Sequence, residues 1–261
     1  MSEKVLFDVV DGVAAVTFNR PDQANAMDLE VMQSLMHISI ECDEDPAIRA
    51  VVITGNGPFF SAGGDLASFL EAGDGAGALI LEMTTHYHAA ISRFSRMNAP
   101  VIAAVNGMAA GAGFSLVAAC DIAIAAESSR YTSAYTAAAL SPDGSSSYFV
   151  PRLVGTRRAM ELMLTNRRLS APEALEWGLV NRVVPDAELM AETMELAGEL
   201  ARGPSVAYGQ VKALLHNSFT GTLETQMELE ARGIAAMTHT HDGVEGVTAF
   251  SEKRPPRYQG R

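Results

Sequence analysis

Cysteine and tryptophan are scarce in this sequence of 261 residues, which contains two cysteines and one tryptophan. Cys42 and Cys120 lie far apart and belong to no C-x-x-C motif or Cys/His spacing. This argues against a disulfide framework and against a cysteine-based metal site. We therefore expect both thiols to be reduced and to behave as small hydrophobic side chains.

Long hydrophobic runs are also missing. No apolar segment approaches the roughly 20 residues that a membrane-spanning helix needs. The first residues, MSEKVLFD, lack the extended apolar core of a secretory signal peptide. We therefore expect no membrane association and a cytoplasmic location.

Basic residues are outnumbered, 19 Lys and Arg against 31 Asp and Glu, for a formal net charge of -12. Such a balance argues against a broad nucleic-acid surface, because phosphate binding requires concentrated positive charge. A polyanionic ligand would have to be bound locally. The one basic cluster is C-terminal, where Lys253, Arg254, Arg257 and Arg261 outweigh Glu252.

The hydrophobic content, 48% of the residues, is sufficient for one large domain with a substantial core. Residues 5–10 and 13–18 read as strands joined by Asp11-Gly12, a dipeptide typical of tight hairpins. Runs of β-branched and small residues at 50–54, 101–105 and 121–126 predict strands buried on both faces. Helix-forming sequence separates them, which is typical of an α/β protein.

Helical signals complete this outline. Asp28 is placed to cap a helix whose core-facing stripe contains Leu29, Met32, Leu35 and Met36. Strand signals stop near Pro185, so the C-terminal part is predicted to be helical. Residues 73–77, GDGAG, predict a mobile loop.

Two glycine-rich segments carry the strongest chemical signal. Residues 59–66, FFSAGGDL, and 106–116, NGMAAGAGFSL, each follow a predicted strand. Either one alone is compatible with an ordinary turn. Together they predict two sets of outward-facing backbone N–H groups, one of them at a helix N-terminus, and such groups stabilise the oxyanion of an acyl-transfer or thioester reaction.

The chain resembles the crotonase (enoyl-CoA hydratase/isomerase) superfamily along nearly its whole length. The ordered segments that carry the resemblance are Asn25-Ala26, Ser61-Ala62-Gly63-Gly64-Asp65-Leu66, Pro100 to Gly107, Cys120-Asp121 and Phe250 to Pro256. The resemblance implies a spiral of β-β-α turns over residues 1–200 and a helical trimerisation region over residues 201–261. A homotrimer or hexamer is the implied assembly.

The resemblance also implies a site for an acyl-CoA substrate. Its oxyanion donors would be the backbone amides of Gly64 and Ala112. Coenzyme A, as part of the substrate, would lie along Gln23, Ala24, Ala26, Ala62, Asp65 and Leu66, with Phe250 and Lys253 reaching its adenosine-phosphate end from a neighbouring subunit. No metal or redox cofactor is implied.

The sequence departs from the family at its acid–base residues. Ser115 and Tyr135 stand where the hydratases of the family carry two catalytic glutamates, so ordinary hydration of a 2-enoyl-CoA loses its expected acid and base. Asp143, in the sequence Ser-Pro-Asp-Gly, is the candidate replacement. Pro-Asp-Gly is also common in simple turns, but the resemblance places functional aspartates of isomerases and 4-chlorobenzoyl-CoA dehalogenases at this position.

Two enzymatic roles for Asp143 follow from the resemblance. As an isomerase base it would move a proton between carbons of an enoyl chain, and this is the role we favour. As a dehalogenase-like nucleophile it would attack an aryl carbon, with His88 activating water to hydrolyse the ester; thioester hydrolysis belongs to the same alternative. Loss of both glutamates also leaves open a catalytically silent acyl-CoA-binding subunit. The acyl pocket is predicted to include Met83, Tyr87, Phe114, Tyr135 and Tyr148, which suggests an aromatic or short branched acyl group.

Overall fold

The computed structural model describes residues 3–261 and contains two sheets. The larger sheet has the strand order β1-β2-β3-β5-β7-β10 and is antiparallel only between β1 and β2. Its strands are β1 Val5–Val10, β2 Val13–Phe18, β3 Ala50–Gly55, β5 Val101–Val105, β7 Ile122–Ala126 and β10 Arg182–Val184. The smaller sheet, in the order β4-β6-β8-β9, is made of β4 Phe59–Ser61, β6 Met108–Ala110, β8 Arg130–Thr132 and β9 Leu169–Ser170.

The chain alternates between these sheets, which gives the β-β-α turns expected from the sequence. β3 leads to β4 and then α2, and β5 leads to β6 and then α4. The helices of the core are α1 Leu29–Glu44, α2 Leu66–Ala72, α3 Ala76–Phe94, α4 Ala112–Ala119, α5 Ser146–Val154, α6 Thr156–Thr165, α7 Ala171–Trp177 and α8 Leu189–Ala201. The predicted α/β architecture is confirmed.

Local sequence explains the first elements. Asp11 and Gly12 both have positive φ, 50° and 80°, and join β1 to β2 with Val10 opposite Val13. Asp28 caps α1, because its carboxylate accepts a hydrogen bond from the Val31 amide. The predicted burial of the central strands is also confirmed, since every residue of β3 and β5 is buried.

Two hydrophobic layers enclose the large sheet. Side chains of β3 and β5 that point to one face pack with α1, α3 and α4, and those that point to the other face pack with α8. Residues 73–77, which the sequence predicts to be a loop, are instead a short 3-10 turn that runs into α3. The flanking helices α2 and α3 thus override the low helix propensity of the glycines.

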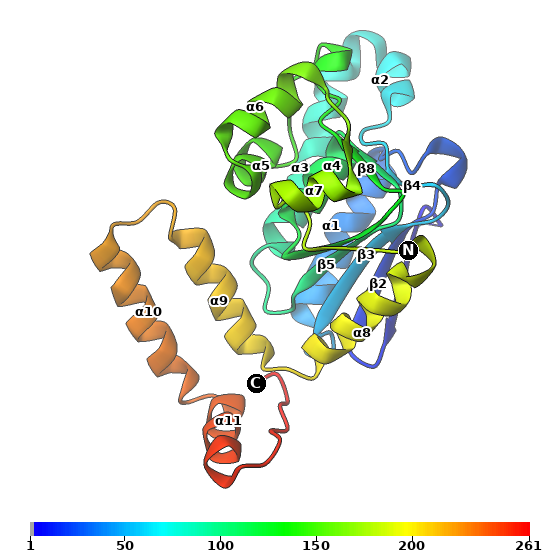
Figure 1. Cartoon of the computed structure of the whole chain (residues 1–261). Coiled ribbons are helices and arrows are strands. Elements are labelled where there is room, and N and C mark those ends of the chain that lie inside the picture. Colours follow the sequence, from blue (N-terminus) through cyan, green and yellow to red (C-terminus); the bar gives the residue numbers. More distant parts are fainter. Residues whose placement is uncertain (1–2) are drawn as a thin grey trace.

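The C-terminal helices α9 Ser205–Asn217, α10 Leu223–Met237 and α11 His241–Glu252 extend away from the core (Figure 1). Lys212 fastens α9 to the core: its ammonium group donates to the carbonyl oxygens of Phe94 and Ala99 and lies 2.7 Å from the Asp121 carboxylate. Within residues 3–261 no helix combines the length and the apolar character that crossing a bilayer requires.

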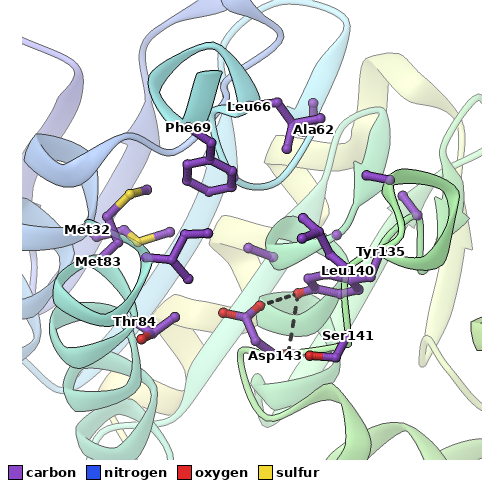
Figure 2. Close-up of a pocket in the computed structure, with 16 residues that line it drawn as sticks. Met32, Ala62, Leu66, Phe69, Met83, Thr84, Tyr135, Leu140, Ser141 and Asp143 are labelled. Atoms are coloured by element: carbon purple, nitrogen blue, oxygen red, sulfur yellow. Dashed lines mark hydrogen bonds between the residues drawn. The ribbon is translucent and has the colours of Figure 1, made fainter. Parts of the chain in front are cut away.

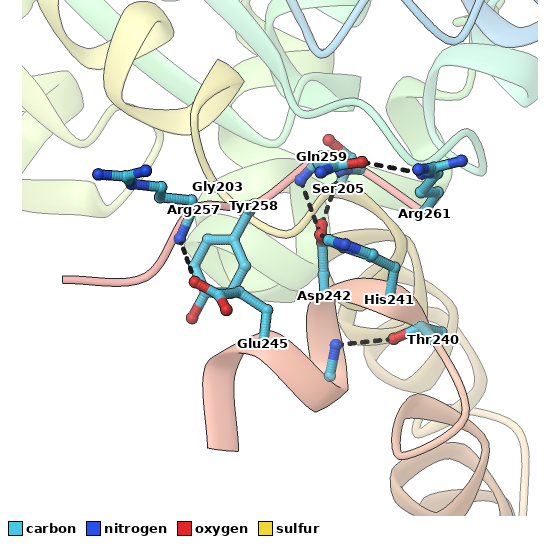
Figure 3. A network of polar contacts seen from close by, with 12 residues as sticks. Gly203, Ser205, Thr240, His241, Asp242, Glu245, Arg257, Tyr258, Gln259 and Arg261 are labelled. Atoms are coloured by element: carbon cyan, nitrogen blue, oxygen red, sulfur yellow. Dashed lines mark hydrogen bonds and ion pairs between the residues drawn. The ribbon is translucent and has the colours of Figure 1, made fainter. Parts of the chain in front are cut away.

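The end of the chain folds back onto α11 (Figure 3). The buried carboxylate of Asp242 accepts from the amides of Gln259 and Gly260, each at 2.7 Å. Arg254 pairs with Glu245 and Glu252. The predicted basic cluster is therefore partly neutralised within the chain.

Candidate active site

A cavity of about 210 Å³ opens between α2, α3, the N-terminus of α4 and the loop before α5 (Figure 2). Most of its wall is apolar, from Met32, Leu66, Phe69, Ile80, Met83 and Leu140. Thr84, Tyr135, Ser141 and Asp143 supply the polar side chains, and Gly64, Gly111 and Ala112 contribute backbone. Asp143 is the only carboxylic acid that lines this cavity among the described residues.

The two glycine-rich segments meet at this cavity, as the sequence predicts. Gly63 has a φ of 96°, and a Cβ at this position would lie 2.9 Å from the Ala112 nitrogen. A Cβ on Gly113 would lie 2.5 Å from the carbonyl oxygen of Ser61. Glycine is therefore required at both positions so that the two backbones can approach this closely.

The amides of Gly64 and Ala112 are available to a ligand. Within residues 3–261 neither N–H donates a hydrogen bond to a protein group. Ala112 is the first residue of α4, so its N–H has no intrahelical acceptor and lies at the positive end of the helix dipole. A thioester oxygen placed between these two donors would be stabilised as negative charge develops on it.

Asp143 is held by two hydroxyl groups. The Tyr135 hydroxyl donates to Oδ1 of Asp143 at 2.7 Å, and the Ser115 oxygen lies 2.8 Å from the Tyr135 oxygen. Ser115 also reaches the backbone oxygen of Asp143 at 3.0 Å and that of Gly111 at 3.1 Å. The two residues that replace the expected glutamates are thus both bonded to the candidate base.

This arrangement suits either protonation state of Asp143. When Asp143 is ionised, Tyr135 donates to its carboxylate and Ser115 donates to Tyr135 or to a backbone oxygen. When Asp143 carries a proton, Tyr135 can donate to Ser115 or, at 3.3 Å, to the Asp143 backbone oxygen. Burial, together with the negative charge of Asp143, raises the pKa of Tyr135 above its ordinary value, so the phenol remains a proton donor.

Comparison with known proteins assigns the family. The Enoyl-CoA hydratase/isomerase family profile matches residues 8–261. The chain belongs to the enoyl-CoA hydratase/isomerase family. It is 36% identical to a 1,2-epoxyphenylacetyl-CoA isomerase of Escherichia coli strain K12 over 100% of both chains. It is 37% identical to 4-chlorobenzoyl coenzyme A dehalogenase-2 of an Arthrobacter species, over 93% of this chain and 88% of the relative.

A solved structure and a further sequence relative agree with this assignment. An enoyl-CoA hydratase from Bacillus anthracis superposes with a TM-score of 0.92 at 34% identity, covering 99% of this chain and 100% of the other. A probable enoyl-CoA hydratase of Rhodobacter capsulatus is 37% identical over 98% of both chains. The names of these relatives cover several reactions on coenzyme A thioesters. Membership of the family therefore identifies the substrate class, whereas the type of reaction has to be inferred from the residues of the site.

His88 lies beside Asp143 but outside this cavity. Its Nε2 is 3.9 Å from Oδ2 of Asp143 and accepts a hydrogen bond from the Gly144 amide at 3.3 Å. The ring is on α3 and lines a second cavity. The role that the resemblance implies for His88 stays a prediction.

Part of the predicted acyl pocket is wrong. Tyr87 and Phe114 are fully buried and do not line the cavity, and Tyr148 lines other depressions. The Tyr87 hydroxyl instead donates to the backbone oxygen of Ala112 at 2.5 Å and so contacts the first residue of α4. Met83 and Tyr135 do line the cavity, together with Phe69.

The residues predicted to hold coenzyme A lie at different distances from the cavity. Ala62 and Leu66 line it, whereas Gln23, Ala24, Ala26 and Asp65 do not. They lie close by, because the Ala62 amide donates to the backbone oxygen of Ala24 at 2.9 Å. Their role as coenzyme contacts stays a prediction.

Arg20 connects this segment, residues 23–26, to Asp65, a role that the sequence did not predict. It lies 3.0 Å from the Asp65 carboxylate and donates to the backbone oxygen of Ala26 at 2.6 Å. The only sequence signal was a cation directly after a strand, which by itself indicates nothing specific. Asp65 is therefore paired within the chain and also caps α2 through the Ala67 amide.

Phe250 and Lys253 lie far from the cavity within one chain. They are at the end of α11, on the opposite side of the molecule from α2 and α4 (Figure 1). Phe250 is 88% exposed. A contact between these residues and the substrate requires a neighbouring subunit and remains a prediction.

Proposed function

We propose that this protein isomerises the carbon–carbon double bond of an enoyl-CoA thioester with Asp143 as its single base. Asp143 removes a proton from C2 of a 3-enoyl thioester, and the electron pair passes into a dienolate whose oxygen is bound by the amides of Gly64 and Ala112. The proton on Asp143 is then delivered to C4, which gives the 2-enoyl product. No metal or redox cofactor takes part.

One observation carries this proposal: among residues 3–261 a single carboxylate lines the cavity that also contains both backbone donors. Hydration needs one group to activate water and another to deliver a proton, whereas isomerisation needs one group that does both in turn. Ser115 and Tyr135 carry no carboxylate, and their hydrogen bonds fit both protonation states of Asp143. The largely apolar wall is suited to excluding water from the intermediate.

Kinetics with Asp143→Asn test the proposal. The amide keeps the size of the side chain but cannot take a proton, so we expect turnover of 3-enoyl-CoA to fall by at least about 100-fold, with acyl-CoA binding nearly unchanged. Ser141→Ala is a control on the same wall and should keep its activity. A rate for the Asp143 variant equal to that of the wild type would remove Asp143 from the reaction.

A dehalogenase-like or thioester-hydrolysing enzyme on an aryl-CoA is the alternative. The position of His88 favours it, because a base near Asp143 could activate water against an aryl ester. Release of chloride from 4-chlorobenzoyl-CoA would establish the alternative. Binding of 2-enoyl, 3-enoyl and aryl thioesters without any turnover would instead identify a silent acyl-CoA-binding subunit.

The acyl group proposed is aromatic or short and branched. A cavity of about 150 Å³ accommodates a benzene ring, and the volume here is about 210 Å³. Phe69 and Tyr135 supply aromatic surface for such a group. The expected order of kcat/KM places aryl and short branched thioesters above long straight-chain ones.

Assembly into a homotrimer, or a hexamer of two trimers, completes the proposal. The C-terminal helices, with the turn between α9 and α10, expose Leu215, Phe219, Leu223, Ile234, Val247 and Phe250. Association would bury this surface and could bring Phe250 and Lys253 to the coenzyme of a neighbour. Sedimentation equilibrium should give a mass three or six times that of the chain, and a monomer would contradict this part.

A further inference from the structure

The two oxygens of the Asp143 carboxylate have different surroundings. Oδ1 is hydrogen-bonded to Tyr135, whereas Oδ2 lies 3.9 Å from Nε2 of His88. The His88 side chain is 53% exposed, compared with 29% for Asp143. His88 is therefore the more exposed member of this pair.

A second cavity gives His88 its access to water. It has a volume of about 360 Å³ and is lined by His88, Ser92, Ser95, Arg96, Ser145 and His216 among others. One water molecule occupies about 30 Å³ of liquid, so this space can hold several. Three serine hydroxyls, the Arg96 guanidinium and two imidazole rings line it beside the apolar side chains of Ile91 and Phe149.

The Gly144 amide orients the imidazole. Because it donates to Nε2 of His88, the lone pair of this nitrogen faces the Asp143–Gly144 loop, and the proton of neutral His88 is on Nδ1. A ring movement of about 1 Å would bring Nε2 within hydrogen-bonding distance of Oδ2. Nδ1 remains free to exchange its proton with water.

We propose that His88 is a proton port, which exchanges the proton carried by Asp143 with solvent through the second cavity while the acyl chain fills the first. The inference rests on the proposed isomerase function. Nε2 of His88 gives up its hydrogen bond from the Gly144 amide, the O–H bond on Asp143 breaks as an N–H bond forms at Nε2, and the imidazolium releases its Nδ1 proton to water. Transfer of a solvent proton in the reverse direction restores the acid, with no change in oxidation state.

The port has a measurable consequence for the product. A proton that stays on Asp143 moves from C2 to C4 of the same molecule, whereas an exchanged proton is replaced by one from solvent. Isomerisation of unlabelled 3-enoyl-CoA in D2O therefore partitions between products with hydrogen and with deuterium at C4. Mass spectrometry of the first product formed gives this ratio independently of the rate.

The test compares the wild type with His88→Gln, whose amide oxygen can still accept from Gly144 but cannot relay a proton. We expect deuterium at C4 in the wild type and a decrease of at least about tenfold in the variant. Ser92→Ala, one turn further along α3 on the wall of the same cavity, should keep the wild-type ratio. Added imidazole should restore deuterium uptake in His88→Ala, which a purely structural role of His88 does not predict.

The outcomes separate the two proposals. Equal deuterium fractions in His88→Gln and the wild type, or no deuterium in the wild type, would overturn the proposed role of His88. The proposed isomerase function would be unaffected. A decrease in Ser92→Ala as large as in His88→Gln would also overturn it, since the effect would then belong to the cavity. A wild type that isomerises no 3-enoyl-CoA would overturn the proposed function and the port with it.

Discussion

Replacing Tyr135 with Phe tests how Asp143 is controlled. The substitution removes the hydrogen bond to Oδ1, which is 2.7 Å long and lies in a largely buried setting. A hydrogen bond to a charged group contributes about 1.5–3 kcal/mol. Without it, Oδ1 is no longer held in place beside the cavity, so kcat for 3-enoyl-CoA should fall by about 10- to 100-fold, with KM nearly unchanged.

The assay measures kcat and KM for the isomerisation of 3-enoyl-CoA. Ser115→Ala leaves the bond between Tyr135 and Asp143 in place and removes only the hydroxyl behind it, so its kcat should fall less. The reasoning would be refuted by a Tyr135→Phe enzyme whose kcat equals that of the wild type. Tyr135 would then support the fold without acting on the base.

Three further perturbations address the scaffold. Gly63→Ala would place a Cβ 2.9 Å from the Ala112 nitrogen, so kcat should fall by about tenfold or more. In the control Gly75→Ala the added Cβ has no atom within 4 Å, so kcat should not change. Equal kcat values for the two variants would contradict this prediction. Lys212→Met removes three contacts of a buried ammonium group. The free energy of unfolding, measured in urea, should fall by about 3 kcal/mol, which is more than a surface substitution costs. Burial raises the pKa of Asp242, but the hydrogen bonds from the amides of residues 259 and 260 outweigh this effect and hold that pKa below 3.8. The ionised carboxylate therefore stabilises the fold above pH 3.8, and this stabilisation is lost as the pH falls through the lowered pKa. In thermal melting, Asp242→Asn should be less stable than the wild type at neutral pH and should lose less stability in acid.

Much of the fold could be predicted because local chemistry specifies it. The dipeptide at residues 11–12 and the cap at Asp28 act within a few residues, and the doubly buried strands are recognisable by composition. Residues 73–77 were predicted wrongly because flanking helices decided their conformation. Short glycine-rich segments have weak local preferences, so tertiary context determines them.

The sequence predicted the individual segments of the site but not the contacts between their side chains. The two glycine-rich segments and Asp143 could be identified along the chain. The direction of Tyr87 and Phe114 into the core could not, since it depends on packing between helices. The hydrogen bonds that join Ser115 and Tyr135 to Asp143, and the pairing of Arg20 with Asp65, likewise exist only after segments distant in sequence have met.

The central claim is that one carboxylate and two backbone donors act on the same thioester. A crystal structure of the Asp143→Asn protein with bound 3-enoyl-CoA tests it most directly. The account predicts a thioester oxygen about 2.7–3.1 Å from both the Gly64 and the Ala112 nitrogens, with the residue-143 side chain facing C2 and C4. A thioester bound with its oxygen away from these amides, or with C2 and C4 out of reach of residue 143, would contradict it.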